Sequence, residues 1–124
     1  GDLGVIDADG YVTIVGRQKD LIIAGGYNIY PKEIELELDE AEGVLESAVI
    51  GVPHPDLGEA VLGVIVPLPG ATPDTAAILA DLGQRLARFK LPRALVVLPE
   101  LPRNTMGKVQ KVVLREQFKD RFSR

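Results

Sequence analysis

Short apolar runs separated by turn residues open the chain. In residues 5–14 two β-branched runs flank Asp9-Gly10, a dipeptide suited to the positive φ values of a tight turn, so this segment predicts an N-terminal β-hairpin. The apolar pattern lapses at GRQKD, residues 16–20, which indicates a hinge or linker. Residues 21–23 then predict a short buried strand that ends at a pair of glycines.

The stretch PKEIELELDE, residues 31–40, contains signals for two different elements. Its alternation of glutamate with isoleucine and leucine is typical of a strand, whereas a proline followed by charged residues is typical of the first turn of a helix. We favour the helix, because acidic side chains near its start suit the macrodipole and Ile34 lies on the same face as Leu38. Leu36 then lies off that face.

The middle of the chain predicts two strands and a helix. Residues 45–52 and 60–66 are apolar and rich in β-branched side chains, so they predict neighbouring strands at the centre of a sheet. Asp74 can cap a helix over residues 74–88. The apolar side chains of that helix recur at helical spacing and need the sheet to cover them: Ile78, Leu79, Leu82 and Leu86.

The last part of the chain predicts a strand at residues 95–98, a turn-rich loop at 99–107 and an amphipathic helix at 109–118. The side chains expected to face the core from this helix are Val112, Val113 and Leu114. Strands and helices therefore alternate irregularly. The predicted fold class is α+β, with a small β-sheet flanked by helices and preceded by the N-terminal hairpin.

Composition narrows the class of protein. A chain of 124 residues with 46% hydrophobic side chains can bury one core, so we expect one compact domain. The sequence has no long uncharged apolar stretch and no leader pattern, which predicts a cytoplasmic protein that does not enter a membrane. Cysteine is absent and His54 is the single histidine, so we expect no disulfide, no thiolate chemistry and no metal site.

Charge is distributed unevenly along the chain. Residues 1–84 carry three basic and fifteen acidic side chains, a net charge of −12, whereas residues 85–124 carry eleven basic and three acidic ones, a net charge of +8. A cationic segment of this kind can bind phosphates of a nucleotide or a nucleic acid, or it can neutralise the acidic half of its own fold. The sequence leaves both interpretations open.

The stretch LPRNTMGKVQK, residues 101–111, places Lys108 directly after a glycine in a polar turn. A phosphate-binding loop of the form G-x-x-x-x-G-K-[ST] would need glycine at position 102 and a hydroxyl at 109, where Pro102 and Val109 stand. Any contact with a nucleotide would therefore come from side chains rather than from a glycine-rich cradle. From the turn alone, Lys108 could equally be a solvated surface lysine.

Three separated stretches together resemble the C-terminal part of the adenylate-forming acyl-CoA synthetases. They are GDLGVIDADGYVTIVGRQKDLIIAGGYNIYPKEIE, VIGVPHPDLGE and LPRNTMGKVQK, in this order. The resemblance implies an enzyme that activates a carboxylic acid with ATP as an acyl adenylate and then transfers the acyl group to coenzyme A, with Mg as a further co-substrate. It also implies that residues 1–18 end a large N-terminal domain and that residues 19–124 form the mobile C-terminal domain. Without that large domain the fragment should be inactive.

The resemblance makes Lys108 the catalytic lysine of adenylation. In the family this lysine reaches the substrate carboxylate and the α-phosphate, two anions that must approach each other. Acetylation of the lysine is known in the family and would remove the charge on which the step depends. A lysine acetyltransferase and a deacetylase acting on Lys108 are therefore possible partners.

Five further residues receive roles from the resemblance. Asp2 matches the aspartate that binds the ribose, and Arg17 matches an arginine that contacts the nucleotide. Lys19 occupies the hinge position about which the small domain rotates between the two half-reactions. Gly25 and Gly26 fall where the family's backbone lines the pantetheine tunnel, a place in which a side chain would block the thiol.

The branch of the family is a further expectation. The sequences NTMGKVQK and GGYNIYPKEIE look most like those of ligases for short or dicarboxylic acids, especially the malonyl-CoA synthetases. Other branches load the thiol of a carrier protein or oxidise the adenylate. A nucleic-acid-binding module is an alternative from another class, but only Phe89, Phe118 and Phe122 could stack on bases in the cationic segment, so we expect no nucleic-acid partner.

Overall fold

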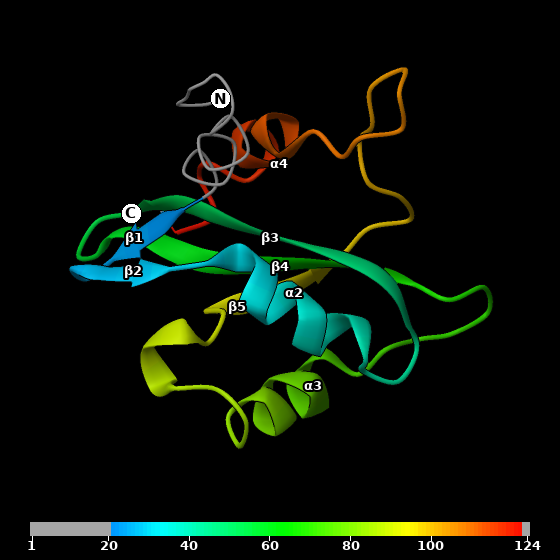
Figure 1. The fold of residues 1–124 in the computed structure, drawn as a ribbon, viewed down its shortest axis with the longest axis horizontal. Coiled ribbons are helices and arrows are strands. Elements are labelled where there is room, and N and C mark those ends of the chain that lie inside the picture. The colour runs from blue at the N-terminus through cyan, green and yellow to red at the C-terminus, as the bar shows by residue number, and fades with distance from the viewer. Residues whose placement is uncertain (1–20, 123–124) are drawn as a thin grey trace, which may run out of the picture.

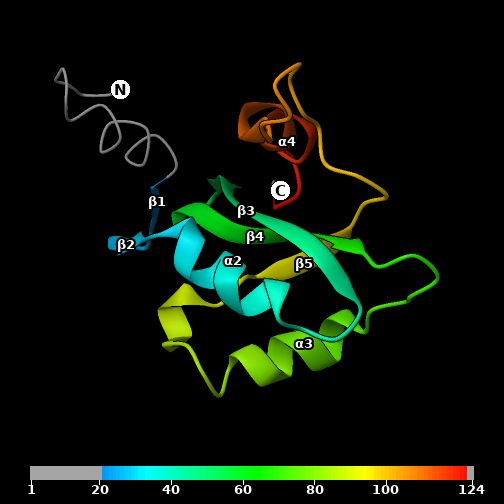
Figure 2. The same ribbon diagram turned by 45° about the vertical axis from the view of Figure 1, so that its right-hand side comes forward.

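The computed structural model describes residues 21–122 (Figure 1). Five strands form one sheet, and helices cover both of its faces (Figures 1 and 2). The α+β class is therefore confirmed. The hairpin predicted at residues 5–14 and the linker at residues 16–20 lie outside the described residues.

The strands are β1 (Ile22–Ala24), β2 (Tyr27–Ile29), β3 (Val44–His54), β4 (Gly58–Pro67) and β5 (Ala94–Val97). Strand β4 lies at the centre, with β3 antiparallel on one side and both β1 and β5 on the other. The two long strands were correctly predicted as neighbours. Only β4 is central, however, because β3 pairs with no other strand in the described part of the chain.

Strand β2 follows β1 through a tight turn and was not predicted as a strand. The two strands pair antiparallel from Ile22 opposite Ile29 to Ala24 opposite Tyr27. Of the three residues of β2, only Ile29 is buried. A strand this short, with one buried side chain, gives too little apolar pattern for recognition from sequence.

The helices are α2 (Pro31–Asp39), α3 (Thr75–Leu82) and α4 (Lys111–Gln117), with a single 3₁₀ turn at Arg88–Lys90. Helices α2 and α3 cover one face of the sheet and α4 covers the other (Figures 1 and 2). Helix α2 confirms the choice made for residues 31–40. Ile34 and Leu38 are fully buried and Leu36 is exposed, as the helical face required.

The core consists of two layers, one on each face of the sheet. Toward α2 and α3, Val49, Val61 and Ile65 are buried, whereas toward α4 the alternate residues of the same strands are buried, among them Ile50 and Leu62. Because both faces are covered, β3 and β4 are apolar almost without interruption. This double burial explains why their sequences form apolar runs and do not alternate.

Two of the predicted helices differ from the structure. Asp74 does cap α3, since its Oδ1 accepts a hydrogen bond from the backbone N–H of Ala77 at 3.1 Å, but the helix ends at Leu82 and does not reach residue 88. In α4 the prediction for Val112 and Val113 was wrong, because their exposed fractions are 62% and 47%. Leu114 alone of the three is buried. No helix in the described part of the chain is long and apolar enough to cross a membrane.

Candidate functional site

Lys108 lies in a small, closed hairpin loop formed by residues 103–109, which we call the 103–109 loop. Arg103 and Val109 form an antiparallel bridge at its base. The backbone N–H of Asn104 donates to the carbonyl of Lys108 at 3.0 Å, and the N–H of Gly107 donates back to the carbonyl of Asn104 at 2.9 Å. Gly107 adopts a φ of +83°, a left-handed conformation that favours glycine.

The side chain of Asn104 closes the same loop from inside. Its Oδ1 accepts hydrogen bonds from the backbone N–H groups of Met106, at 2.9 Å, and Lys108, at 3.0 Å. Asparagine is well suited to this position because its short polar side chain can bind backbone donors two to four residues on. The loop is therefore internally hydrogen-bonded, and these bonds hold the backbone on both sides of Lys108.

Lys108 itself is exposed at this loop, and its ammonium has no ion-pair partner within residues 21–122. The segment between β5 and α4, coloured yellow to orange in Figures 1 and 2, rises from the sheet on the side that α4 covers. It is held at both ends by the core, because Leu101 before the loop and Leu114 after it are both buried. This arrangement presents a positive charge to whatever approaches that end of the domain.

Gly25 and Gly26 form the turn between β1 and β2. Both are exposed, and both have positive φ values, +58° and +87°. The N–H of Gly25 donates to the carbonyl of Leu57 at 3.0 Å, and a Cβ added at Gly25 would lie 3.3 Å from the Cδ2 of Leu57. A Cβ added at Gly26 would meet nothing within 4 Å. The backbone of Gly26 is thus open to an approaching molecule.

A groove of about 640 Å³ runs beside this turn. Its wall includes Tyr27 and Phe89, whose rings stack with centroids 4.4 Å apart and an interplanar angle of 21°. Arg88 and Arg93 line the same groove together with Gly25. Sequence reasoning counted these two arginines only as part of the cationic segment, because the pairing that brings them to β1 and β2 is tertiary.

The structure separates Lys108 from the glycine turn. Strand β1 meets β4 at Gly58, whereas the 103–109 loop is tied to Glu46, which lies opposite Val66 near the other end of β4. Gly58 and Val66 are eight residues apart, so these two points of β4 are separated by roughly 27 Å at about 3.4 Å per residue. Figures 1 and 2 show the two loops at different ends of the sheet.

His54 was predicted as a loop residue, and it lies at the last position of β3. Its Nδ1 accepts hydrogen bonds from the backbone N–H groups of Asp56, at 3.0 Å, and Leu57, at 3.2 Å. The imidazole therefore caps the turn between β3 and β4. Within residues 21–122 there is no group of three or more histidine, cysteine, aspartate or glutamate side chains placed to hold a metal ion.

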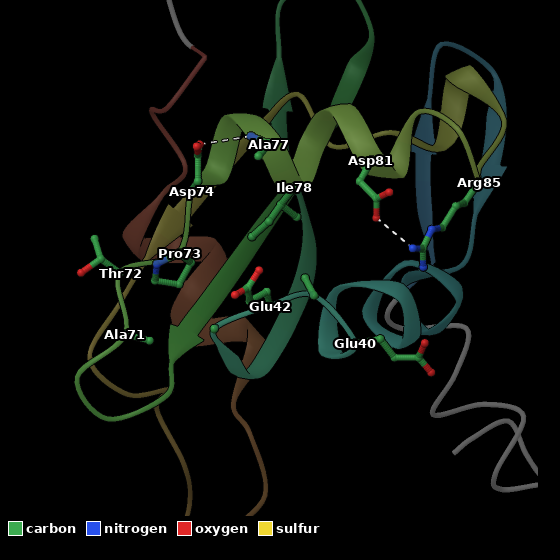
Figure 3. Close-up of a pocket in the computed structure, with 12 residues that line it drawn as sticks. Glu40, Glu42, Ala71, Thr72, Pro73, Asp74, Ala77, Ile78, Asp81 and Arg85 are labelled. Atoms are coloured by element: carbon green, nitrogen blue, oxygen red, sulfur yellow. Dashed lines mark hydrogen bonds and ion pairs between the residues drawn. The ribbon is translucent and has the colours of Figure 1, made fainter.

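A second groove, of about 680 Å³, lies between the end of α2 and α3 (Figure 3). Carboxylates surround it, including Glu40 and Glu42, and Asp81 pairs with Arg85 at 3.1 Å across one end (Figure 3). Asp74 also lines it but is occupied in capping α3. The expected site residues that the structure describes, Lys108, Gly25 and Gly26, do not line this groove.

Comparison with known proteins identifies the domain. The indoleacetate–CoA ligase of Aromatoleum aromaticum is 47% identical over 116 residues, and the sulfoacetate–CoA ligase of Cupriavidus necator is 46% identical over 114. These alignments cover 94% and 92% of this chain, but 23% and 22% of the relatives. The crystal structure of apo MatB from Rhodopseudomonas palustris matches with a TM-score of 0.83 at 58% identity, over 86% of this chain and 21% of that one.

These matches fix the class of protein, since the relatives are acyl-CoA ligases and the fold is that of a domain from an enzyme family. Residues 33–108 match the AMP-binding enzyme C-terminal domain, and the chain belongs to that family. The resemblance on which the sequence analysis relied is confirmed. The chain spans less than a quarter of the length of these relatives, so the matches describe one domain of a larger enzyme.

Of the expected site residues, Lys108, Gly25 and Gly26 lie in the described part of the chain. Asp2, Arg17 and Lys19 lie outside it. The boundary expected between residues 18 and 19 lies outside it as well.

Proposed function

We propose that this chain is the C-terminal domain of an ATP-dependent acyl-CoA ligase. One end of its sheet would serve adenylation and the other end would serve thioester formation. The observation that carries the proposal is the exposed side chain of Lys108 on an internally hydrogen-bonded loop, in a chain that belongs to the AMP-binding enzyme C-terminal domain family. The glycine turn, at the other end of the sheet, would serve thioester formation.

Adenylation joins a carboxylate to the α-phosphate of ATP, so two anions approach and negative charge gathers at phosphorus. A lysine ammonium about 4 Å from that charge is worth roughly 4 kcal/mol at an effective dielectric constant of 20, before the cost of desolvation. Lys108 has no internal ion-pair partner in the described chain that would compete for this charge. Lys108 would therefore bridge the carboxylate and the phosphate.

Thioester formation needs a narrow path for the thiol of coenzyme A and a site for its phosphates. Gly25 and Gly26 supply exposed backbone without side chains, which permits close approach. Arg88 and Arg93 line the groove beside Gly25, and arginine suits phosphate because its guanidinium donates in a planar fork. The glycine turn would suit the pantetheine arm of either acceptor, and the two arginines support coenzyme A because they suit a ligand with several phosphates.

The proposal is tested in the protein that carries the large domain. Lys108→Ala should lower the rate of adenylate formation, followed by pyrophosphate exchange, by about 10²- to 10³-fold, the usual loss for one such donor. Thioester formation from a supplied acyl adenylate should be largely spared. Lys119→Ala is the matched control, because it removes an exposed cation that pairs with Glu116 at 2.7 Å, outside the loop.

Adenylate formation at the normal rate in Lys108→Ala would remove the basis of the proposal. Equal losses in both half-reactions would contradict the assignment of one end of the domain to each step.

The remaining assignments form part of the same proposal. Asp2 and Arg17 would hold the nucleotide and Lys19 would be the hinge between residues 1–18 and residues 19–124. Mg would accompany ATP, and residues 21–122 contain no group of three or more histidine, cysteine, aspartate or glutamate side chains that could hold it. Acetylation of Lys108 would switch adenylation off, because it removes the positive charge.

A short or dicarboxylic acid such as malonate is the proposed acyl substrate. The likeness to MatB, a malonyl-CoA synthetase, supports it. The relatives act on acids as different as indoleacetate and sulfoacetate, so the substrate must be tested directly. A panel of short mono- and dicarboxylic acids, assayed with the complete enzyme, should give the highest kcat/KM with malonate.

A further inference from the structure

Arg103 makes two contacts that join the tip of the 103–109 loop to the body of the domain. One guanidinium nitrogen, Nη1, donates to the backbone carbonyl of Gly107 at 2.8 Å. The other, Nη2, pairs with the carboxylate of Glu46 on β3. Gly107 immediately precedes Lys108, so a single side chain connects the peptide that carries the lysine to the edge of the sheet.

The chemistry of arginine fits this position. A guanidinium presents several N–H donors in a fixed plane, so it can hold a carbonyl on one side and a carboxylate on the other without changing its shape. A lysine has a point-like ammonium on a flexible stem and would not hold both partners in a fixed direction. Arg103 lies within LPRNTMGKVQK, but neither the motif nor its spacing assigned it a role.

A contribution to the overall stability of the fold does not sufficiently explain the two contacts of Arg103. The side chain of Arg103 is 39% exposed, and exposed ion pairs typically contribute little to folding. The antiparallel bridge, the hydrogen bonds of Asn104 and the buried Leu101 already close and anchor the loop. What the pair with Glu46 adds is a fixed direction of the loop relative to β3.

We propose that Arg103 is a positioning residue for adenylation. By holding the carbonyl of Gly107 and the carboxylate of Glu46 together, it sets the direction in which the side chain of Lys108 points away from the domain. This inference rests on the proposed role of Lys108 and adds a residue that does not touch the substrate. Displacement of a reacting group by about 1 Å can cost roughly 10²-fold in rate, so loss of this tie should be measurable.

The experiment uses the complete enzyme and measures the two half-reactions separately. Arg103→Met keeps the length and apolar stem of the side chain and should lower adenylate formation by about 10- to 100-fold, with the thioester step from supplied adenylate unchanged. Glu46→Gln should show a smaller loss in the same step. Arg103→Lys, which preserves the charge but not the fork, should fall between the wild type and Arg103→Met.

Arg85→Met is the matched control. Arg85 also pairs with two groups, Glu37 at 3.2 Å and Asp81 at 3.1 Å, and its side chain is 49% exposed, but these partners lie on α2 and α3, which cover the other face of the sheet. It should leave both half-reactions at the wild-type rate. Loss of adenylation in Arg85→Met equal to that in Arg103→Met would overturn the proposal.

A second measurement separates positioning from other roles. In a Lys108→Ala background, Arg103→Met should cause no further loss of adenylation, because a residue that acts only through Lys108 has nothing left to position. A further loss of the same factor, or equal losses in both half-reactions, would overturn the proposal. If Lys108→Ala alone leaves adenylation intact, the proposed function fails as well; if only Arg103→Met is silent, this inference alone fails.

Discussion

At the scale of single residues, a substitution of Gly26 can separate two reasons for glycine at this position. One is its positive φ, and the other is the space that a side chain would fill. Its φ of +87° penalises any other residue by roughly 1–2 kcal/mol, but its surroundings in this domain are open. Gly26→Gln should therefore fold with a modest loss of stability. In the complete enzyme it should lower thioester formation by roughly tenfold or more and spare adenylation, because the new side chain would occupy the proposed path of the thiol.

Gly70 provides the matched control for that substitution. It has a φ of +80° and open surroundings, and it lies in the loop between β4 and α3, away from the glycine turn. Gly70→Gln should lose about as much stability in thermal unfolding as Gly26→Gln, with both half-reactions unchanged. If Gly70→Gln also lost thioester formation, backbone strain and not a blocked path would explain the effect.

At the scale of elements, Glu35 links the helices on the two faces of the sheet across the edge strand. Its Oε2 accepts a hydrogen bond from the backbone N–H of Val49 at 2.9 Å and pairs with Lys111 of α4 at 2.7 Å. The side chains of Glu35 and Lys111 are only 14% and 16% exposed. The edge of β3 is thus covered by side chains, which also protects it from pairing with another chain.

Replacement of Glu35 should destabilise the domain more than replacement of an exposed acid on the same helix. Glu35→Ala leaves the N–H of Val49 and the ammonium of Lys111 without their acceptor, so the free energy of unfolding in urea should fall by about 1–3 kcal/mol. Glu35→Gln keeps a neutral acceptor and should cost less. Glu33→Ala, which removes an exposed pair with Lys90, should cost no more than about 1 kcal/mol; a larger effect there than at Glu35 would contradict this account.

The elements also show what could be learned from sequence. Strands β3 and β4 were predictable because each is an almost continuous apolar run. Helix α2 could be predicted in spite of its strand-like alternation, because a proline opens it and Ile34 and Leu38 lie on one helical face. Three consecutive apolar residues in α4 cannot share a face when each residue turns the helix by about 100°, so only Leu114 reaches the core, and the aromatic ring of Phe118, four residues on, packs on the same side. The groove arginines and Arg103 could not be predicted, since their roles depend on partners far away in the chain.

At the scale of the whole molecule, the uneven charge is partly neutralised by ion pairs within the fold. Four cations of residues 85–124 pair with acids of the first half of the chain: Arg85 with Glu37, Lys90 with Glu33, Arg103 with Glu46 and Lys111 with Glu35. The cationic segment therefore neutralises part of the acidic charge of its own fold. Lys108 is not one of these four: it is exposed and has no ion pair within residues 21–122, and the same holds for Arg88 and Arg93, which line the groove beside Gly25.

The separation of the two loops makes a prediction about the complete enzyme. With the acid and ATP bound, amide hydrogen exchange should slow in residues 103–109, because that loop would face the large domain during adenylation. With coenzyme A added to the adenylate state, protection should move to the turn at residues 25–27, since the opposite end of the sheet must then be presented. The loop of residues 68–74 should exchange at the same rate in both states.

If each loop serves one half-reaction, the domain must rotate between them, because the two loops cannot face one site from opposite ends of β4. Protection of both loops in a single state would show that one arrangement suffices for both half-reactions. A fixed domain would also leave the exchange pattern unchanged when coenzyme A is added. The 103–109 loop already has its internal hydrogen bonds in the isolated domain. Slower amide exchange in this loop would therefore report contact with another surface and not closure of the loop itself.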